Sequence, residues 1–324
     1  MSAGTYYVAH RLFALHDRAL GAMVAGELAR QVGEEAVFLP FCDTDEETLV
    51  TNCKGRTLFE LDHERLGRLA GMIAIVHGPS IDDGVCMEVG YACRQGVPVV
   101  LLTTDFQTYA LAEECPEMAF PDPLLEALAD SVVRVHQLAP MRATVHDRLA
   151  AFARQNLRPL RHAARTAVER LLATPMPGAS CATSARCTPQ LAFLESSPYQ
   201  QPERWQAVAA QLDALGWQVH QATRLRPPFG LRTADLLTRA RADWMARGRA
   251  ELLIVDINGP ETPPGAALLI GAALADGRRI LAAYETRSCT FAPGREPNFR
   301  NLMIQYSISA RFRRPDELPG LLQS

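Results

Sequence analysis

The segment that decides the fold is Met72–Ala92, which reads MIAIVHGPSIDDGVCMEVGYA. Five apolar residues, Met72–Val76, lead into Gly78-Pro79, and an apolar helical pattern follows. A short buried strand, a glycine turn and a helix, in that order, are typical of a parallel sheet covered by helices. One residue breaks the pattern. Glu88 is a carboxylate among apolar neighbours, so it either costs stability or performs chemistry.

The same alternation of apolar runs and helical segments extends over residues 1–173. We predict strands at residues 5–9, 37–40, 72–76, 98–102 and 132–135, and helices at 14–31, 57–69, 85–95 and 141–173, the last with a break before Pro159. The segment 174–190 is rich in Pro, Ser and Thr, and we interpret it as a linker. Beyond it the pattern restarts, with strands at 191–194, 219–220 and 252–257 and a helix at 202–215.

A repeat of glycines connects the two halves of the chain. Gly78-Pro79, Gly84 and Gly90 recur 181 positions later as Gly259-Pro260, Gly265 and Gly271. The carboxylates do not recur, because Leu269 stands where Glu88 would be, and Pro263 and Pro264 stand for Asp82 and Asp83. We therefore predict a tandem duplication whose second copy, residues 191–324, keeps the scaffold and lacks the chemistry.

The predicted fold class is α/β. It comprises two flavodoxin-like or Rossmann-like doubly wound domains in tandem, each with a parallel sheet of about five strands flanked by helices.

Composition excludes several function classes. The 324 residues carry a net charge of −3, which gives no electrostatic case for binding a nucleic-acid polymer or a membrane surface. No apolar run approaches the roughly 20 residues that cross a bilayer, and the first residues do not resemble a secretory signal. We expect a cytoplasmic protein with free thiols. Cys181, Cys187 and His162 do not have the spacing of a zinc site, so we expect no metal.

The carboxylates of the opening segment suggest glycosyl transfer. Ligands bind at the carboxyl ends of parallel strands, where the loop after residue 76 begins. Glu88 would lie in the first turns of a helix, whose dipole favours the ionised, nucleophilic form. Asp82 could donate a proton to the leaving group, as in glycoside chemistry, or it could only cap the helix. For Asp83 we favour the cap.

The motifs resemble those of nucleoside 2-deoxyribosyltransferases over about the first 105 residues. They are Tyr6-Tyr7-Val8-Ala9 with Leu12-Phe13, Phe38-Leu39-Pro40, Asp62, Gly78-Pro79-x-x-Asp82-x-Gly84-x-x-x-Glu88-x-Gly90-Tyr91-Ala92, Gly96-x-Pro98 and Thr104-Asp105. The resemblance implies that Glu88 is the nucleophile, that Asp62 and Asp82 serve the base, and that Tyr7 positions Glu88. Ala70 departs from the family, which usually has Asp there.

The resemblance also implies a site shared between subunits. In the family, a neighbouring subunit supplies an Asn-Leu-Met segment whose Asn contacts the sugar 5′-hydroxyl. The first half lacks such a segment, whereas the second half has it as Asn301-Leu302-Met303. We therefore hypothesise one composite site per chain, with Asn301 and Met303 binding substrate. The alternative is that this segment is a loop followed by a core strand.

The predicted activity is transfer of a nucleoside's sugar to another base through a glycosyl ester on Glu88. We predict catalytic roles for Glu88, Asp62, Asp82 and Tyr7, and substrate contacts for Gly78, Asn301, Met303, Phe13 and His77. The predicted partners are nucleosides and free nucleobases, with no cofactor, and the chain would be a monomeric pseudo-dimer or a homodimer. The alternatives are a nucleoside or nucleotide N-glycosidase and a catalytically silent nucleoside-binding module.

Overall fold

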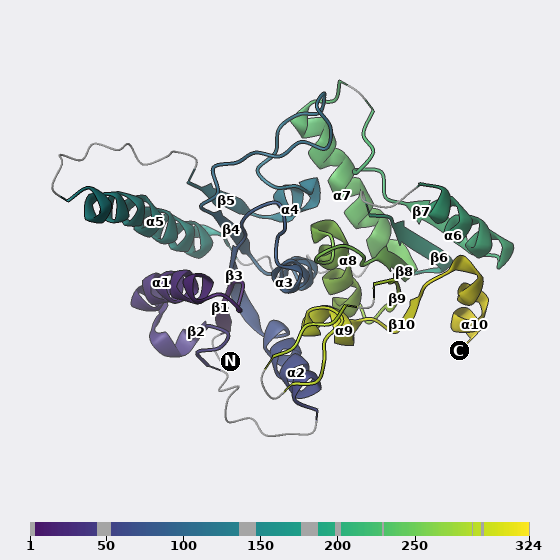
Figure 1. Ribbon diagram of the computed structural model, residues 1–324, viewed down its shortest axis with the longest axis horizontal. Helices are drawn as coiled ribbons and strands as arrows, with labels where there is room; N and C mark the ends of the chain where they lie inside the picture. The colour runs from purple at the N-terminus through teal and green to yellow at the C-terminus, as the bar shows by residue number, and fades with distance from the viewer. Residues whose placement is uncertain are drawn as a thin grey trace.

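The computed structural model describes residues 4–43, 53–135, 147–175, 187–197, 202–228, 230–286, 288–292 and 295–323. Over these ranges the chain forms two five-stranded parallel sheets, one in each half (Figure 1). The first sheet has the order β2-β1-β3-β4-β5, and the second has the order β7-β6-β8-β9-β10, which is the same order along the chain. The predicted fold class is confirmed.

The elements of the first half follow the sequence prediction closely. Its strands are β1 (Thr5–Ala9), β2 (Val37–Phe38), β3 (Leu69–Ile75), β4 (Val99–Thr103) and β5 (Ser131–Arg134), and its helices are α1 (Leu15–Val32), α2 (Lys54–Leu66), α3 (Asp83–Arg94), α4 (Pro123–Leu128) and α5 (Arg148–Ala173). The predicted break before Pro159 is wrong, because α5 runs through it. That half of α5 is largely exposed, so water can solvate a carbonyl that loses its N–H partner. Residues 141–146 of the predicted helix lie outside the described residues.

The second half repeats this element order. Its strands are β6 (Thr188–Glu195), β7 (Gln218–Gln221), β8 (Ala250–Asp256), β9 (Arg279–Ala283) and β10 (Ala310–Phe312), and its helices are α6 (Pro202–Ala214), α7 (Thr233–Arg249), α8 (Pro264–Ala275), α9 (Leu302–Ser307) and α10 (Leu318–Gln323). Strand β6 begins inside the predicted linker, of which residues 176–186 lie outside the described part of the chain. No described helix is long and apolar enough to span a bilayer.

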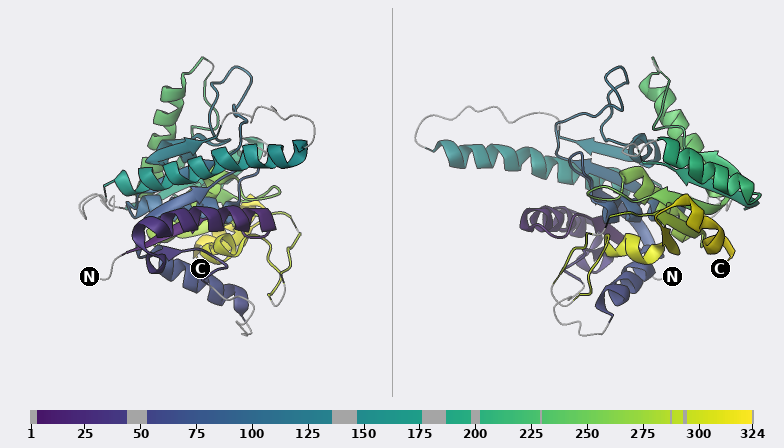
Figure 2. Two further views of the ribbon diagram at one scale, coloured as in Figure 1. Left: turned by 90° about the vertical axis from the view of Figure 1, so that its left-hand side faces the viewer. Right: turned by 45° about the vertical axis from the view of Figure 1, so that its right-hand side comes forward.

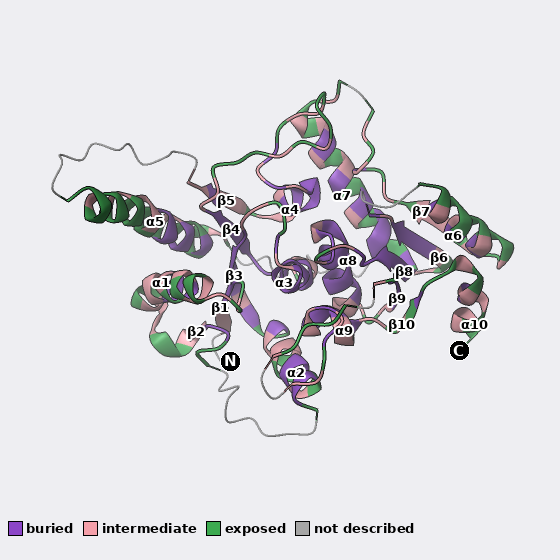
Figure 3. Ribbon diagram, in the orientation of Figure 1, coloured by how far each residue is buried: buried purple, intermediate pink, exposed green. Residues whose placement is uncertain are grey.

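Alternating side chains of the strands build three apolar layers. On one face of the first sheet, α1 and α5 lie side by side over Val8, Ile73 and Val100 (Figure 2). On the outer face of the second sheet, α6 and α10 cover a smaller cluster. Between the sheets lies a larger core that contains both α3 and α8, the most completely buried helices of the centre (Figure 3). The two halves therefore share one central core.

The two halves meet where α3 crosses α8. Gly90 and Gly271, which recur 181 positions apart, lie at this contact. A Cβ on Gly90 would lie 2.0 Å from the Leu268 carbonyl oxygen, and a Cβ on Gly271 would lie 1.9 Å from the Met87 carbonyl oxygen. Met87 and Leu268 are themselves 181 positions apart, as are the two glycines. Each half thus presents the same surface to the other, which is the contact pattern of a two-fold dimer interface.

Candidate functional site

A cavity of about 280 Å³ lies between the halves, at the carboxyl ends of the first sheet's strands. Its first wall comes from β1, α2, α3 and the loop after β1. Its second wall comes from residues 260–261, 288–290, 295 and 298–303. Most of the predicted site residues line it: Tyr7, Phe13, Asp62, Asp82, Glu88, Asn301 and Met303. The structure therefore brings together residues that are more than 200 positions apart in the sequence.

Glu88 lies against the inner end of this cavity, held by Tyr7. Only 8% of Glu88 is exposed, and the Tyr7 hydroxyl donates to Glu88 Oε1 at 2.9 Å. Tyr7 is fully buried and comes from the middle of β1, so its ring fixes the position of the carboxylate. One oxygen of Glu88 is thus oriented by a neutral donor, which is the arrangement a carboxylate nucleophile needs.

The expectation that the helix dipole keeps Glu88 ionised is wrong in direction. Burial, followed by the nearby charge of Asp62, raises the pKa of Glu88 well above its ordinary value, and the Tyr7 hydrogen bond opposes this only in part. Glu88 is the sixth residue of α3, beyond the free N–H groups of the first turn where the dipole acts most strongly. Burial is therefore the dominant influence.

Two aspartates share this environment. Burial raises the pKa of Asp62 to about 7, with Arg65 opposing. Burial and the neighbouring Asp83 raise the pKa of Asp82 to about 6. Asp62 and Asp82 each also raise the pKa of Glu88, so these carboxyl groups keep their protons to higher pH than isolated ones do. A group that carries a proton at neutral pH can act as the general acid for a departing base.

The capping role belongs to Asp82 rather than Asp83. Asp82 Oδ1 accepts from the Val85 N–H at 3.0 Å, so Asp82 is the N-cap of α3 and also lines the cavity. Asp83 instead reaches across the domain boundary, where its Oδ2 accepts from the Thr262 N–H at 3.1 Å. The prediction that Asp83 caps the helix is wrong, because packing against the second half turns its side chain away from α3.

Sequence reasoning missed an ion pair across the cavity. Arg11 donates to Glu261 Oε1 at 2.6 Å, from the loop after β1 to the loop after β8. Burial and the charges of Asp82 and Asp83 raise the pKa of Glu261 to about 7, with Arg11 opposing. Glu261 directly follows the repeated Gly259-Pro260 turn.

Asn301 faces the start of α3 from the second half. Its Oδ1 accepts from the Met303 N–H at 3.0 Å, so Asn301 caps α9. A Cβ on Gly84 would lie 2.4 Å from Asn301 Nδ2, which places the amide in close contact with the backbone two residues after Asp82. Met303 is buried beside it. The predicted strand alternative is wrong, because this segment starts a short helix.

Two predicted residues lie outside the main cavity. His77 and Gly78 line an adjoining cavity of about 340 Å³ that shares Arg11 and Asp82 with it. His77 Nε2 is 2.8 Å from the Thr104 hydroxyl, and the Gly78 N–H donates to Asp105 Oδ2 at 3.2 Å. Gly78 has φ +73°, so it serves the turn at the end of β3.

Among the described residues, no group of three or more His, Cys, Asp or Glu side chains is arranged to hold a metal ion.

The geometry defines a domain that carries a buried carboxyl group, Glu88, at a sheet edge. Residues 6–137 match the family model described as nucleoside 2-deoxyribosyltransferase, so the resemblance seen in the sequence is confirmed over these residues. That family supports a glycosyl-transfer function on nucleosides and nucleobases for the first half. The matched segment does not extend into the second half.

Other comparisons are more distant. No curated protein matches the chain. A solved structure described as a conserved protein from Enterococcus faecalis V583 is 28% identical, with a TM-score of 0.27. The match covers 32% of this chain and 65% of that protein, which is less than two thirds of its length.

Proposed function

We propose that the chain is a nucleoside 2-deoxyribosyltransferase that passes the sugar of a nucleoside to a second base, and so serves nucleoside salvage in the cytoplasm. The observation that carries the proposal is the buried Glu88 carboxyl group, oriented by Tyr7 at 2.9 Å in a cavity that Asp62 and Asp82 also line. Such a constellation suits attack on an anomeric carbon, with a nearby acid to assist the leaving base.

The reaction takes place in two steps, formation of a glycosyl ester on Glu88 and its cleavage by the incoming base. In the first, Glu88 Oε attacks C1′, the C1′–N bond breaks, and the departing base takes a proton from the Asp62 and Asp82 pair. In the second, a nitrogen of the incoming base attacks C1′, the ester to Glu88 breaks, and the incoming N–H proton returns to the aspartates. The proton on an aspartate also lowers the repulsion that opposes ionisation of Glu88.

The charge of the cavity favours nucleosides over nucleotides. Asp82, Asp83 and Glu261 gather at the start of α3, and Arg11 is already paired with Glu261. Arg300, a buried cation at the second wall of the cavity, donates to the carbonyls of Ile257 and Gly259. A 5′-phosphate placed there would be repelled by the carboxylates.

Base exchange tests the proposal directly. The enzyme is incubated with a 2′-deoxynucleoside, with and without a different free base, and products are separated chromatographically. We expect the new nucleoside only when the second base is present. Free sugar at equal rates with and without that base would mean hydrolysis, and binding without turnover would mean a silent module; either result contradicts the proposal.

Asn301→Ala tests the composite site. We expect a roughly tenfold rise in KM for the nucleoside, because the amide would no longer contact the sugar. Since Asn301 also caps α9, Asn301→Ser supplies the control that retains a capping oxygen without the amide. Asn156→Ala, on the exposed face of α5, is expected to have no effect. Unchanged KM in both Asn301 variants would remove Asn301 from the site.

A further inference from the structure

The second half contains positions that match those of the cavity. Phe193 pairs with β8 in the same register in which Tyr7 pairs with β3. Asp243 and Gly265 lie 181 positions after Asp62 and Gly84. The region of the second half that corresponds to the cavity is therefore bounded by counterparts of the cavity residues, with Leu269 at the position of Glu88.

Asp122 is the counterpart of Asn301. Each residue caps a six-residue helix by accepting from the N–H two residues on, Asp122 from Leu124 at 2.8 Å. Each also crosses to the other half. Asn301 lies against Gly84, and a Cβ on Gly265 would lie 2.1 Å from Asp122 Oδ2. Each half thus contributes a helix-capping side chain that lies against the matching glycine of the other half, Asn301 at Gly84 and Asp122 at Gly265.

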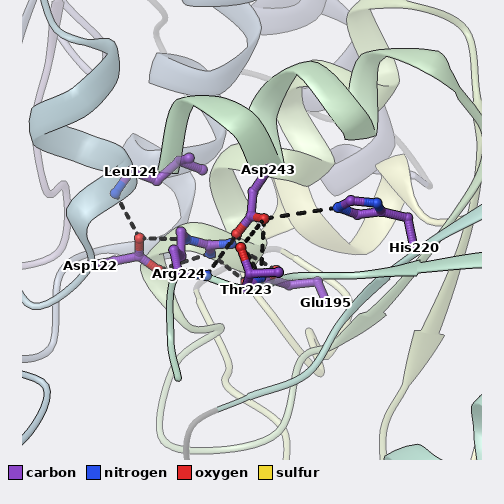
Figure 4. A network of polar contacts seen from close by, with 7 residues as sticks. All are labelled: Asp122, Leu124, Glu195, His220, Thr223, Arg224 and Asp243. Carbon is purple, nitrogen blue, oxygen red and sulfur yellow. Dashed lines mark hydrogen bonds and ion pairs between the residues drawn. The ribbon is translucent and has the colours of Figure 1, made fainter. Parts of the chain in front are cut away.

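Arg224 fills this region of the second half. Its side chain is fully buried, and a Cβ on Gly265 would lie 2.0 Å from its Nη2. The guanidinium donates to Asp122 Oδ1 at 2.9 Å and to Asp122 Oδ2 at 3.0 Å (Figure 4). It also donates to Glu195 Oε2 at 2.9 Å, and to Glu195 Oε1. Two bidentate pairs use the planar guanidinium fully.

A third carboxylate completes the group. Asp243 Oδ2 lies 3.5 Å from Arg224 Nη1 and accepts from the Arg224 backbone N–H at 3.0 Å. Asp243 also accepts from the hydroxyl of Thr223 at 3.0 Å. We call Asp122, Glu195, Arg224 and Asp243 the counterpart cluster. Asp122 comes from the first half and the other three come from the second, so the cluster spans the boundary.

We propose that the counterpart cluster is a guanidinium-binding site whose resident ligand is the chain's own Arg224. This ligand occupies the place that the sugar would take in the first half, so each chain binds one nucleoside. It also ties Asp122 of the first half to the second half. The stoichiometry rests on the proposed function, whereas the guanidinium site does not.

Chemical rescue tests the site without any substrate. Arg224→Ala leaves three buried carboxylates without their cation, and we expect its Tm to fall by about 10 °C. Millimolar methylguanidinium should recover at least half of this loss, and methylurea, an uncharged compound of the same shape, should recover none. Arg232→Ala, which removes an exposed arginine paired with Asp235, should show no recovery with either compound.

The rescue experiment distinguishes a guanidinium site from a general loss of packing. Recovery with methylguanidinium alone supports the site, as does an Arg224→Ala protein that folds only in its presence. A folded Arg224→Ala protein that gains nothing from methylguanidinium overturns it. Equilibrium dialysis of a labelled nucleoside against the Glu88→Gln variant then counts sites. We expect one per chain, and two per chain would overturn the proposal. No binding at all would contradict the proposed function, and the rescue experiment would still decide on Arg224.

Discussion

Replacing Glu88 with glutamine will reduce base exchange by about 10⁴-fold or more, and the variant will be more stable than the wild type at pH 8. The loss of activity follows because an amide cannot form the glycosyl ester, so the two-step route is closed. The residual rate would come from binding and proton transfer alone. Chromatographic assay of base exchange, with the enzyme in excess to capture slow turnover, measures this directly.

The gain in stability follows from the pKa of Glu88. Because burial raises this pKa well above its ordinary value in the folded chain, the folded state binds the proton more tightly than the unfolded state. The stabilisation is complete below the ordinary pKa and is lost as the pH rises through the folded pKa. Glutamine does not titrate, so the variant avoids this loss. The Tm difference between variant and wild type should therefore widen from pH 5 to pH 8.

A matched control separates this effect from a general change of charge. Glu60→Gln removes an exposed carboxylate from α2, and we expect neither its base exchange nor its Tm to change measurably. If Glu88→Gln retained base exchange, another residue would be the nucleophile. If it were less stable than the wild type at pH 8, the Tyr7 hydrogen bond would stabilise the ionised Glu88 more than burial and Asp62 destabilise it, and the raised pKa would be wrong.

Sequence patterns were sufficient to predict the strands of the first sheet and to single out Glu88 as a candidate nucleophile. Strands such as β3 and β4 are continuous apolar runs, and buried parallel strands require that pattern whatever surrounds them. Glu88 stood out because the glycines beside it recur in the second half and it does not. The position of Asn301 opposite α3 followed from the family resemblance, since nothing in its local sequence points to the cavity.

The features of the site that were missed depend largely on contacts between the halves. Asp83 was predicted as a cap from its place in the chain, but it bonds Thr262, 179 positions away. The pair of Arg11 and Glu261 is separated by 250 positions. The ionisation of Glu88 depends mainly on how deeply the folded chain buries it. No short stretch of the sequence encodes contacts between residues so far apart. They form when the two halves pack together at the α3–α8 crossing.

Gly271 lies at the crossing of α3 and α8, against the backbone of α3. Gly271→Ala should lower the free energy of unfolding by about 3 kcal/mol, at the upper end for overpacking. The added methyl would lie 1.9 Å from the Met87 carbonyl oxygen and 2.8 Å from the Tyr91 nitrogen, and both are backbone atoms that cannot rotate away. The helices must move apart to accommodate it.

Movement of the helices should affect activity as well as stability. Asn301 and Gly84 face each other across the same boundary, so separating α3 from α8 would widen the cavity. We expect kcat/KM for base exchange to fall at least tenfold at a temperature where the variant is fully folded. Urea unfolding measures the stability, and the radius of gyration from small-angle scattering reports whether the halves separate.

Gly26→Ala is the control for the substitution itself. Gly26 lies within α1, and a Cβ there would meet no atom within 4 Å, so alanine should stabilise the helix by up to about 1 kcal/mol. Opposite signs for the two variants would show that the close contact at the crossing, rather than helix propensity, determines the result. If Gly271→Ala behaved like Gly26→Ala, the crossing would tolerate the methyl, and the geometry of the composite site could not depend on the approach of α3 and α8.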